Sequence, residues 1–235
     1  MIKNFKFIPF KKARLMSIAI FTILNLLITP QFIIKATETE PQITKAYKPR
    51  PGRKRTQARK PGGYRGESCN WGSQEPVTLI VPQDHIPLTT STHPTFFWNV
   101  NTISHPIRFT LYEPGQPSPL YVQNITPTTP GIVALSLPTT AKGLKIGVQY
   151  RWTVSIICNR LAPSENIYAK AWIERVESSS SSGNISSCLS YYAQTGIWYD
   201  ALSCQEKSTK EFWSLLNQVQ LSAIAHKQPQ ITFID

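Results

Sequence analysis

Acidic residues are missing from the start of this sequence, because no Asp or Glu occurs before Glu38. Five basic side chains come first, and an almost uncharged apolar stretch then runs from Leu15 to about Ile34. A basic segment followed by an apolar one is typical of a secretory signal. The stretch is also long enough to span a bilayer, although Pro30 interrupts it. We predict that residues 1–36 are a signal peptide or an uncleaved anchor, and that the protein is exported to the periplasm, the cell envelope or the exterior.

Excess charge is also absent from most of the chain, although the net charge is +12. Six Lys or Arg lie in residues 1–36, and nine more lie between Lys45 and Arg65. From Gly66 onward, ten basic residues are balanced by eleven acidic ones. The body of the protein is therefore nearly neutral. Its basic composition does not indicate a nucleic-acid partner, and we expect none.

Apolar residues are scarce in the basic segment, where Ala46, Tyr47 and Ala58 stand among Pro, Gly, Lys and Arg. Such a composition cannot bury enough surface to offset the entropy of the chain. We predict that residues 37–66 are a disordered basic linker, which is either a solvated tether or a contact for anionic lipid or polysaccharide. The candidates for that contact are Arg50, Arg53, Lys54, Arg55, Arg59 and Lys60.

Proline is missing inside seven short apolar segments but frequent between them. Because proline cannot donate a hydrogen bond to a sheet, this distribution indicates strands. The predicted strands are Val77–Val81, Thr95–Val100, Ile107–Glu113, Leu120–Ile125, Ile132–Leu137, Gln149–Cys158 and Ile167–Val176. Trp98 and Trp152 are interpreted as core residues rather than as an exposed binding platform. Residues 67–177 therefore predict an antiparallel β-sandwich, which resembles the immunoglobulin and fibronectin type III plan.

The end of the chain lacks this strand pattern. Residues 178–184 form a Ser-rich joint, and apolar residues then recur at helical spacing. We predict a helical tail over residues 185–226 and a C-terminal extension over 227–235 that is compatible with an edge strand. Residues 192–202 resemble part of a tetratricopeptide helical pair, so we expect a short helical hairpin. It either docks on the sandwich or binds a partner, for which the candidate residues are Trp198, Tyr199, Asp200 and Trp213.

Paired metal-ligand motifs are absent, since the four cysteines are isolated from one another. Structural zinc sites need pairs such as Cys-x-x-Cys, so we expect neither a metal nor a cofactor. In an exported protein an even number of cysteines favours disulfides. Of the three possible connectivities we favour Cys69–Cys158 with Cys188–Cys204. Three histidines next to prolines or in turns are interpreted as ordinary loop residues, namely His85, His93 and His105.

Motifs of common enzyme classes are missing as well, among them Gly-x-Ser-x-Gly, His-Glu-x-x-His, the P-loop and Gly-x-Gly-x-x-Gly. Pairs of carboxylates, such as Asp84 with Glu113 or Glu165 with Asp200, are numerically possible for a glycosidase. Nothing in the sequence selects these pairs. We predict that the protein is not an enzyme, and an unrecognised hydrolase is the more distant alternative.

Short sequences spread over residues 62–226 carry a family resemblance. They are Gly62–Cys69, Val77–Pro82, Pro94–Trp98, Pro130–Val133, Tyr150–Trp152, Ala171–Val176, Gly196–Leu202 and Trp213–Leu216. In the order and composition of these short sequences, the chain resembles the cyanobacterial family known as domain of unknown function 928. The chain departs from the family at Tyr64, where a serine is usual. The resemblance implies no activity, substrate or catalytic residue, but it implies an exported protein whose sandwich and helical tail form one unit.

These observations together favour a non-enzymatic module of the cell envelope. We expect it to bind an unidentified protein there, through the helical tail or through a strand edge. The alternative is a surface-binding module that attaches to anionic lipid or polysaccharide through the basic linker.

Overall fold

The computed structural model describes residues 47–52, 59–60, 75–101, 105–127, 129–178, 188–204 and 210–234, with only the backbone at 59–60. All of them belong to one compact unit, Ile43–Asp235. The predicted signal or anchor at 1–36 and nearly all of the Ser-rich joint lie outside the described residues. Among the described helices, none has the length and apolar character that crossing a bilayer requires.

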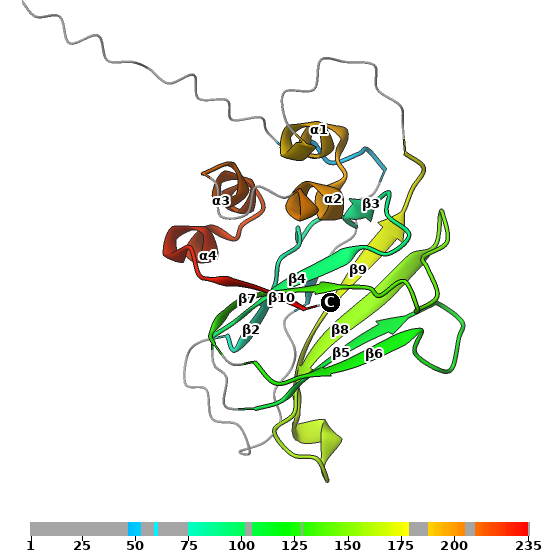
Figure 1. Ribbon diagram of the computed structural model, residues 1–235, viewed down its shortest axis with the longest axis vertical. Coiled ribbons are helices and arrows are strands. Elements are labelled where there is room, and N and C mark those ends of the chain that lie inside the picture. Colours follow the sequence, from blue (N-terminus) through cyan, green and yellow to red (C-terminus); the bar gives the residue numbers. More distant parts are fainter. Residues whose placement is uncertain are drawn as a thin grey trace, which may run out of the picture. The chain divides into compact units, whose positions relative to one another are not determined.

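The larger sheet has six strands, and most of its neighbours run antiparallel (Figure 1). Its order is β1 (Arg59–Lys60), β9 (Ile167–Arg175), β8 (Gln149–Ile156), β5 (Ile107–Tyr112) and β6 (Tyr121–Ile125). The short strand β3 (Leu88–Thr89) pairs in parallel with the end of β9. The strand β6 therefore ends the sheet on one side.

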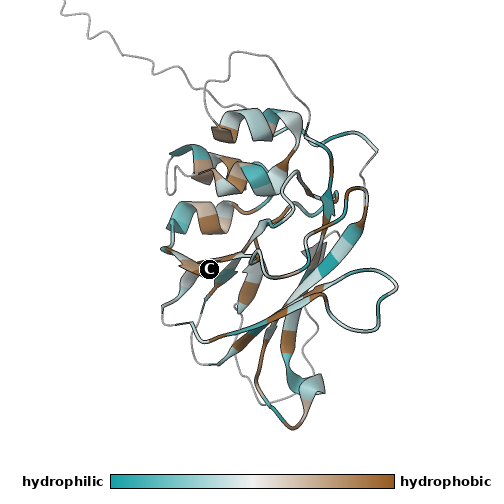
Figure 2. Ribbon diagram, turned by 45° about the vertical axis from the view of Figure 1, so that its right-hand side comes forward, coloured by the Kyte–Doolittle hydropathy of each residue, from teal (hydrophilic) through white to brown (hydrophobic). Residues whose placement is uncertain are grey.

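The smaller sheet has four strands, in the order β10 (Ile231–Ile234), β7 (Gly131–Ser136), β4 (Thr95–Val100) and β2 (Val77–Leu79). The strand β10 is parallel to β7, whereas the other two pairs are antiparallel. The C-terminal extension thus supplies an edge strand, with which its apolar composition is compatible. Apolar and polar residues alternate along several strands in Figure 2, and β10 begins in the same way with Ile231, Thr232 and Phe233.

Aromatic rings fill the space between the two sheets. The indoles of Trp98 and Trp152 are fully buried and lie 6.5 Å apart between ring centroids. Phe96 and Phe109 pack against Trp152 at 5.2 and 5.9 Å. Alternation places these side chains inside, because every second residue of a strand points to the same face. The interpretation of both tryptophans as core residues is confirmed.

Four short helices follow the sandwich in sequence: α1 (Cys188–Thr195), α2 (Trp198–Ser203), α3 (Lys210–Asn217) and α4 (Ser222–Lys227). Gly196 ends α1 with a φ of +75°. A Cβ at this position would lie 2.6 Å from the carbonyl oxygen of Lys48, so the close approach of the two backbones requires glycine. In Figure 1, α2 lies beside β3 and β4, and α1 lies above α2.

The mainly β architecture with helices at the C-terminal end is confirmed. Each of the seven predicted strands is present, with ends shifted by at most two residues. The two-residue strands β1 and β3 and the last helix α4 were not predicted, because they are too short to produce a periodic pattern.

Candidate functional site

The helix α2 inserts its two aromatic side chains into the sandwich. The indole Nε1 of Trp198 donates a hydrogen bond to the carbonyl oxygen of Ile80 at 2.9 Å. The hydroxyl of Tyr199 accepts one from Nε1 of Trp152 at 2.8 Å and donates one to the carbonyl oxygen of Trp172 at 3.1 Å. Burial raises the pKa of Tyr199 well above its usual value. A single hydroxyl therefore joins the helix to two strands of the larger sheet.

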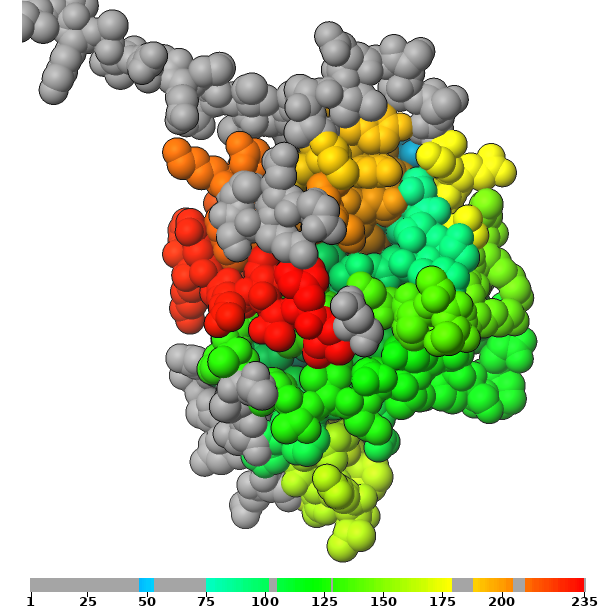
Figure 3. All heavy atoms as spheres, in the orientation of Figure 1, coloured from blue at the N-terminus to red at the C-terminus, as the bar shows by residue number. Residues whose placement is uncertain are grey.

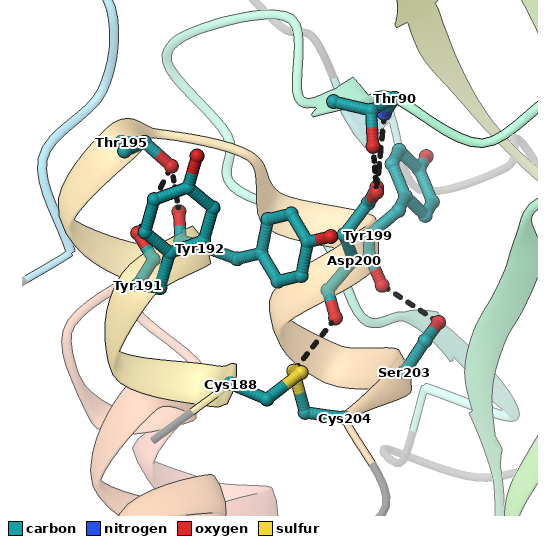
Figure 4. Close-up of a disulfide and its surroundings, with 9 residues drawn as sticks. All are labelled: Thr90, Cys188, Tyr191, Tyr192, Thr195, Tyr199, Asp200, Ser203 and Cys204. Carbon is teal, nitrogen blue, oxygen red and sulfur yellow. Dashed lines mark hydrogen bonds between the residues drawn. A yellow bond between two sulfur atoms is a disulfide. The ribbon is translucent and has the colours of Figure 1, made fainter. Parts of the chain in front are cut away.

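Asp200, the next residue, fastens the same helix to β3. Its carboxylate accepts a hydrogen bond from the hydroxyl of Thr89 at 2.6 Å. It also accepts hydrogen bonds from the hydroxyl and the N–H of Thr90 at 2.5 and 3.1 Å (Figure 4). A carboxylate that accepts several such bonds is held firmly in place.

Three of the four predicted partner-binding residues are thus internal. Trp198, Tyr199 and Trp213 are buried within the chain, and the ring of Trp213 packs on that of Phe212. The prediction that these aromatic side chains form a partner-binding surface is wrong. The physical reason is that such short helices are not stable alone. They are stabilised by burying their apolar side chains against the sandwich, whose core they complete. The alternative interpretation, docking of the tail on the sandwich, is confirmed.

A disulfide joins α1 to the residue that follows α2. Cys188 and Cys204 are bonded, as predicted, with their Cα atoms 5.7 Å apart (Figure 4). Cys158 is disulfide-bonded as well. Its predicted partner Cys69 lies outside the described residues, and that pairing stays a prediction. None of the described cysteines is free.

A relay of three polar side chains lies beside the helices. The hydroxyl of Tyr47 and Nε2 of His85 are 2.7 Å apart, and Nδ1 of His85 lies 2.7 Å from Oδ1 of Asp84. Tyr47 and His85 also stack, and both are buried. Burial raises the pKa of Tyr47 far above its usual range, so its hydroxyl keeps its proton. The order of hydroxyl, imidazole and carboxylate resembles that of a catalytic triad, but here the hydroxyl belongs to a buried tyrosine.

Tyr47, the outer residue of the relay, belongs to a strap formed by residues 47–50. The N–H of Lys48 donates to the carbonyl oxygen of Ala193 at 3.0 Å, and Nε of Arg50 donates to that of Thr195 at 3.0 Å. The N–H of Tyr47 donates to Oε1 of Gln218. The prediction of a disordered linker over 37–66 is therefore wrong for this part and for Arg59–Lys60, which form β1. The composition of this segment does not predict the strap, because a single aromatic ring, that of Tyr47, packs it against the rest of the protein.

The residues predicted to contact an anionic surface have different environments. Arg50 is half-buried, and its guanidinium is bound to the end of α1. The backbone of Arg59 and Lys60 pairs with β9. Arg53, Lys54 and Arg55 lie outside the described residues.

Each carboxylate that was considered for a glycosidase pair has partners of its own. Asp84 contacts His85, and Asp200 accepts a hydrogen bond from Thr89 of β3. Glu113 forms salt bridges with Lys142 and Lys145, and its hydrogen bond with Lys145 lowers its pKa. Glu165 accepts a hydrogen bond from Asn159 at 3.1 Å. In Figure 1 the turn η1 (Pro163–Glu165) lies at the bottom of the sandwich and α2 lies near the top, so Glu165 and Asp200 are not a pair.

The loop between β8 and β9 is tightly hydrogen-bonded. Oδ1 of Asn166 accepts from the N–H groups of Cys158 and Asn159 at 2.9 and 3.1 Å. Oδ1 of Asn159 accepts from the N–H groups of Leu161 and Ala162 at 2.9 and 3.2 Å. These bonds fix a loop that protrudes from the sandwich as the yellow-green atoms at the bottom of Figure 3. At its tip Leu161 is 96% exposed.

A recess of about 430 Å³ adjoins this loop. Two arginines, Arg108 and Arg160, contribute to its lining, together with Ile125, Ile157 and prolines. Among the described residues neither arginine forms a salt bridge; Nε of Arg108 donates to Oδ1 of Asn124 at 3.0 Å. The recess therefore combines two positive charges with a lining of polar and apolar side chains.

The edge of β6 that is not paired with β5 adjoins the recess. The N–H of Ile157 donates to the carbonyl oxygen of Pro106, so alternate residues of β5 face β8 and the residues between them face β6. The same alternation directs the N–H and C=O groups of Val122 and Asn124 away from β5. Such an edge accepts an additional strand.

Within the described residues no group of three His, Cys, Asp or Glu side chains could hold a metal ion. His93 contacts the carbonyl oxygen of Ala141 through Nε2 at 3.1 Å. Sequence reasoning missed the strap and the recess, because both depend on contacts between residues that are distant in sequence. It also missed the fixed loop, although the bonds of that loop are local.

Comparison with known proteins identifies one family. The model of the family described as Domain of Unknown Function (DUF928) matches residues 60–229, and the chain belongs to this family. No curated protein and no solved structure matches the chain.

Proposed function

We propose that this member of the family is an exported, non-enzymatic module that binds another protein of the cell envelope. We assign the binding surface to the end of the sandwich formed by β6 and the β8–β9 loop. The exposure of Leu161 on a loop fixed by hydrogen bonds is the observation that carries this proposal. A rigid exposed apolar side chain loses little conformational entropy when it is buried by a partner, which favours binding.

We also propose that the sandwich is of the immunoglobulin and fibronectin type III kind. Labelling β2, β4, β5, β6, β7, β8 and β9 as A, B, C, C′, E, F and G gives the sheet orders A-B-E and C′-C-F-G. These orders agree with those of immunoglobulin-like domains, which are common recognition modules. The proposal further treats α1 and α2 as a single tetratricopeptide-like pair that binds the protein's own sandwich.

The absence of a catalytic role is part of the proposal. The polar side chains that resemble catalytic groups, His85, Asp84 and Asp200, all join distant segments of the chain. Such contacts stabilise a fold and leave the groups little freedom to take part in a reaction. The oxidised state of the described cysteines supports export, because disulfides persist in oxidising compartments.

The predicted mode of binding is strand addition to β6 combined with burial of Leu161. The edge groups of Val122 and Asn124 supply hydrogen bonds to an extended segment of the partner. The two arginines of the recess then favour a partner that carries a carboxylate beside this segment. The partner is therefore expected to offer an extended, acidic stretch.

The test is capture of proteins from envelope extracts by the full chain and its variants. Leu161→Asp removes the apolar contact, and Val122→Pro removes an outward N–H without touching the bonds to β5. Ile146→Asp is the matched control, since Ile146 is also exposed. A protein retained by the wild type and the control but lost with both variants supports the proposal. Equal retention by all four proteins contradicts it.

Attachment to an anionic surface is the second candidate function. Basic residues concentrated between Lys45 and Arg65 support it. The bond between Arg50 and Thr195 removes one of its predicted contacts.

A further inference from the structure

The outward face of the six-stranded sheet carries basic and aromatic side chains. On β5, β8 and β9 the residues that alternate with the core point to this face. Six of them matter here: Arg108, Tyr112, Arg151, Tyr168, Lys170 and Trp172. Arg108 and Arg151 are exposed, and Tyr168 is 40% exposed.

The register of the strands arranges these side chains in rows. Arg151 pairs with Tyr112 on one side and with Trp172 on the other, so a cation lies between two rings. The guanidinium carbon of Arg151 is 5.0 Å from the centre of the Tyr112 ring. Because neighbouring strands lie about 4.8 Å apart, the backbones that carry the two rings are roughly 10 Å apart.

A second row and an intermediate cation extend the pattern along the sheet. Arg108 pairs with Ser155, which pairs with Tyr168, so this row again combines a cation and a ring. Lys170 lies between the two rows, opposite Thr153. Cations and rings therefore lie close to one another in two rows, with Lys170 between them.

Negative charge is almost missing from this face. On β5, β6, β8 and β9 the outward positions include one acidic residue, Glu174. Its side chain is buried and accepts a hydrogen bond from Nε2 of Gln149 at 3.1 Å. Although the body is nearly neutral as a whole, this face is positively charged.

We propose that this face binds a linear anionic polysaccharide that carries carboxylate or sulfate groups. Guanidinium groups form paired hydrogen bonds with carboxylate and sulfate oxygens. Aromatic rings pack on the apolar C–H faces of sugar rings, because the electron-rich ring face attracts them. The groups stand on adjacent strands, so little entropy is lost in ordering them.

The oxidised cysteines decide between polysaccharide and nucleic acid. An aromatic and basic sheet face also suits single-stranded nucleic acid. The disulfide Cys188–Cys204 and the oxidised Cys158 point to an oxidising compartment outside the cytosol, where an exported protein seldom meets nucleic acid. The surface shares Arg108 with the protein-binding end but does not include Leu161, the apolar contact of that end.

The experiment measures binding of the full chain to alginate, a polymer of uronic acids, and to dextran sulfate, with neutral dextran as a control. Arg151→Glu is compared with Lys227→Glu, an equal change of charge at an exposed residue of α4. Tyr168→Ala is compared with Phe233→Ala, since both rings are 40% exposed. Thermal unfolding of each variant verifies that it is folded.

The proposal predicts binding to at least one anionic polymer and none to dextran. Arg151→Glu weakens this binding by at least about tenfold, and Tyr168→Ala weakens it by about fivefold. Both controls stay within about twofold of the wild type, as does Leu161→Asp, which separates this site from the protein-binding end.

Four results would overturn the proposal. The first is no binding to either anionic polymer. The second is unchanged binding by Arg151→Glu together with loss of binding when Arg53, Lys54 and Arg55 are neutralised, which would move the site to the linker. The third and fourth are tighter binding to single-stranded oligothymidylate, or to phosphatidylglycerol vesicles, than to the polysaccharides.

Discussion

Tyr199 is the residue on which the docking of the helices most depends. Its hydroxyl links Trp152 and Trp172, and its ring packs against Phe96 at 5.8 Å. Removal of the hydroxyl leaves the buried Nε1 of Trp152 without an acceptor. An unpaired buried donor costs about 1–3 kcal/mol.

We therefore predict that Tyr199→Phe lowers the free energy of unfolding by about 1–3 kcal/mol in denaturant titrations. Tyr168→Phe is the control, because its hydroxyl lies on the exposed face, and a change within about 0.5 kcal/mol is expected. If Tyr199→Phe is as stable as the wild type, the bond to Trp152 contributes nothing.

Two buried tyrosines make the fold sensitive to alkali. Burial raises the pKa of both Tyr47 and Tyr199 above the ordinary value of about 10. A raised pKa means that the folded protein holds these protons after the unfolded chain has lost them. Their contribution is fully present below about pH 10 and is lost as the pH rises above it.

Spectrophotometric titration measures this directly. We predict that Tyr47 and Tyr199 fail to ionise until the far-UV circular dichroism shows unfolding. Ionisation of all tyrosines in one step, with the secondary structure intact, would show that Tyr47 and Tyr199 are accessible.

At the scale of elements, the disulfide holds α1 and α2 together. Cys188 and Cys204 are 16 residues apart, and closing a loop of this size stabilises by about 3 kcal/mol in the chain-entropy model. We predict that the double variant Cys188→Ser with Cys204→Ser loses about that amount in thermal or denaturant unfolding. The control is wild-type protein without reductant. An unchanged midpoint would mean that the docked helices do not need the bond.

The strands could be predicted because alternation and the positions of proline are local features. The strand β8, for example, shows Tyr150, Trp152 and Val154 alternating with polar residues. The strand β3 could not be predicted, since two residues contain no period and its pairing with β9 is set by tertiary contacts. The same limit applies to α4.

The candidate site was less predictable than the strands. The aromatic side chains of α2 were identified as important, but the sequence does not reveal whether a ring faces the protein's own core or a partner. Tyr47 shows the opposite case, because a composition typical of disorder conceals one ring that packs beside His85. The loop that presents Leu161 depends on Asn159 and Asn166. The bond that Asn159 accepts from the N–H of Leu161 is a local Asx turn, but the sequence does not show that the loop leaves Leu161 exposed.

At the scale of the whole molecule, the helices complete the sandwich. Tyr199 and Asp200 fasten α2 to the strands, and residues 47–50 cross over α1. The surfaces that we propose for partners are the outward sheet face and the end near β6. Loss of the helices would expose Trp152, so we expect a chain truncated after residue 178 to aggregate or unfold.

Hydrogen exchange of the full chain tests most directly whether helices and sandwich are one cooperative unit. We predict that amides of Trp198–Ser203 and of Gln149–Ile156 exchange only through global unfolding, with the same free energy and the same response to denaturant. Exchange of the α2 amides at least about a hundredfold faster, while the sheet stays protected, would contradict the account, because the helices would then be a detachable element free to bind a partner.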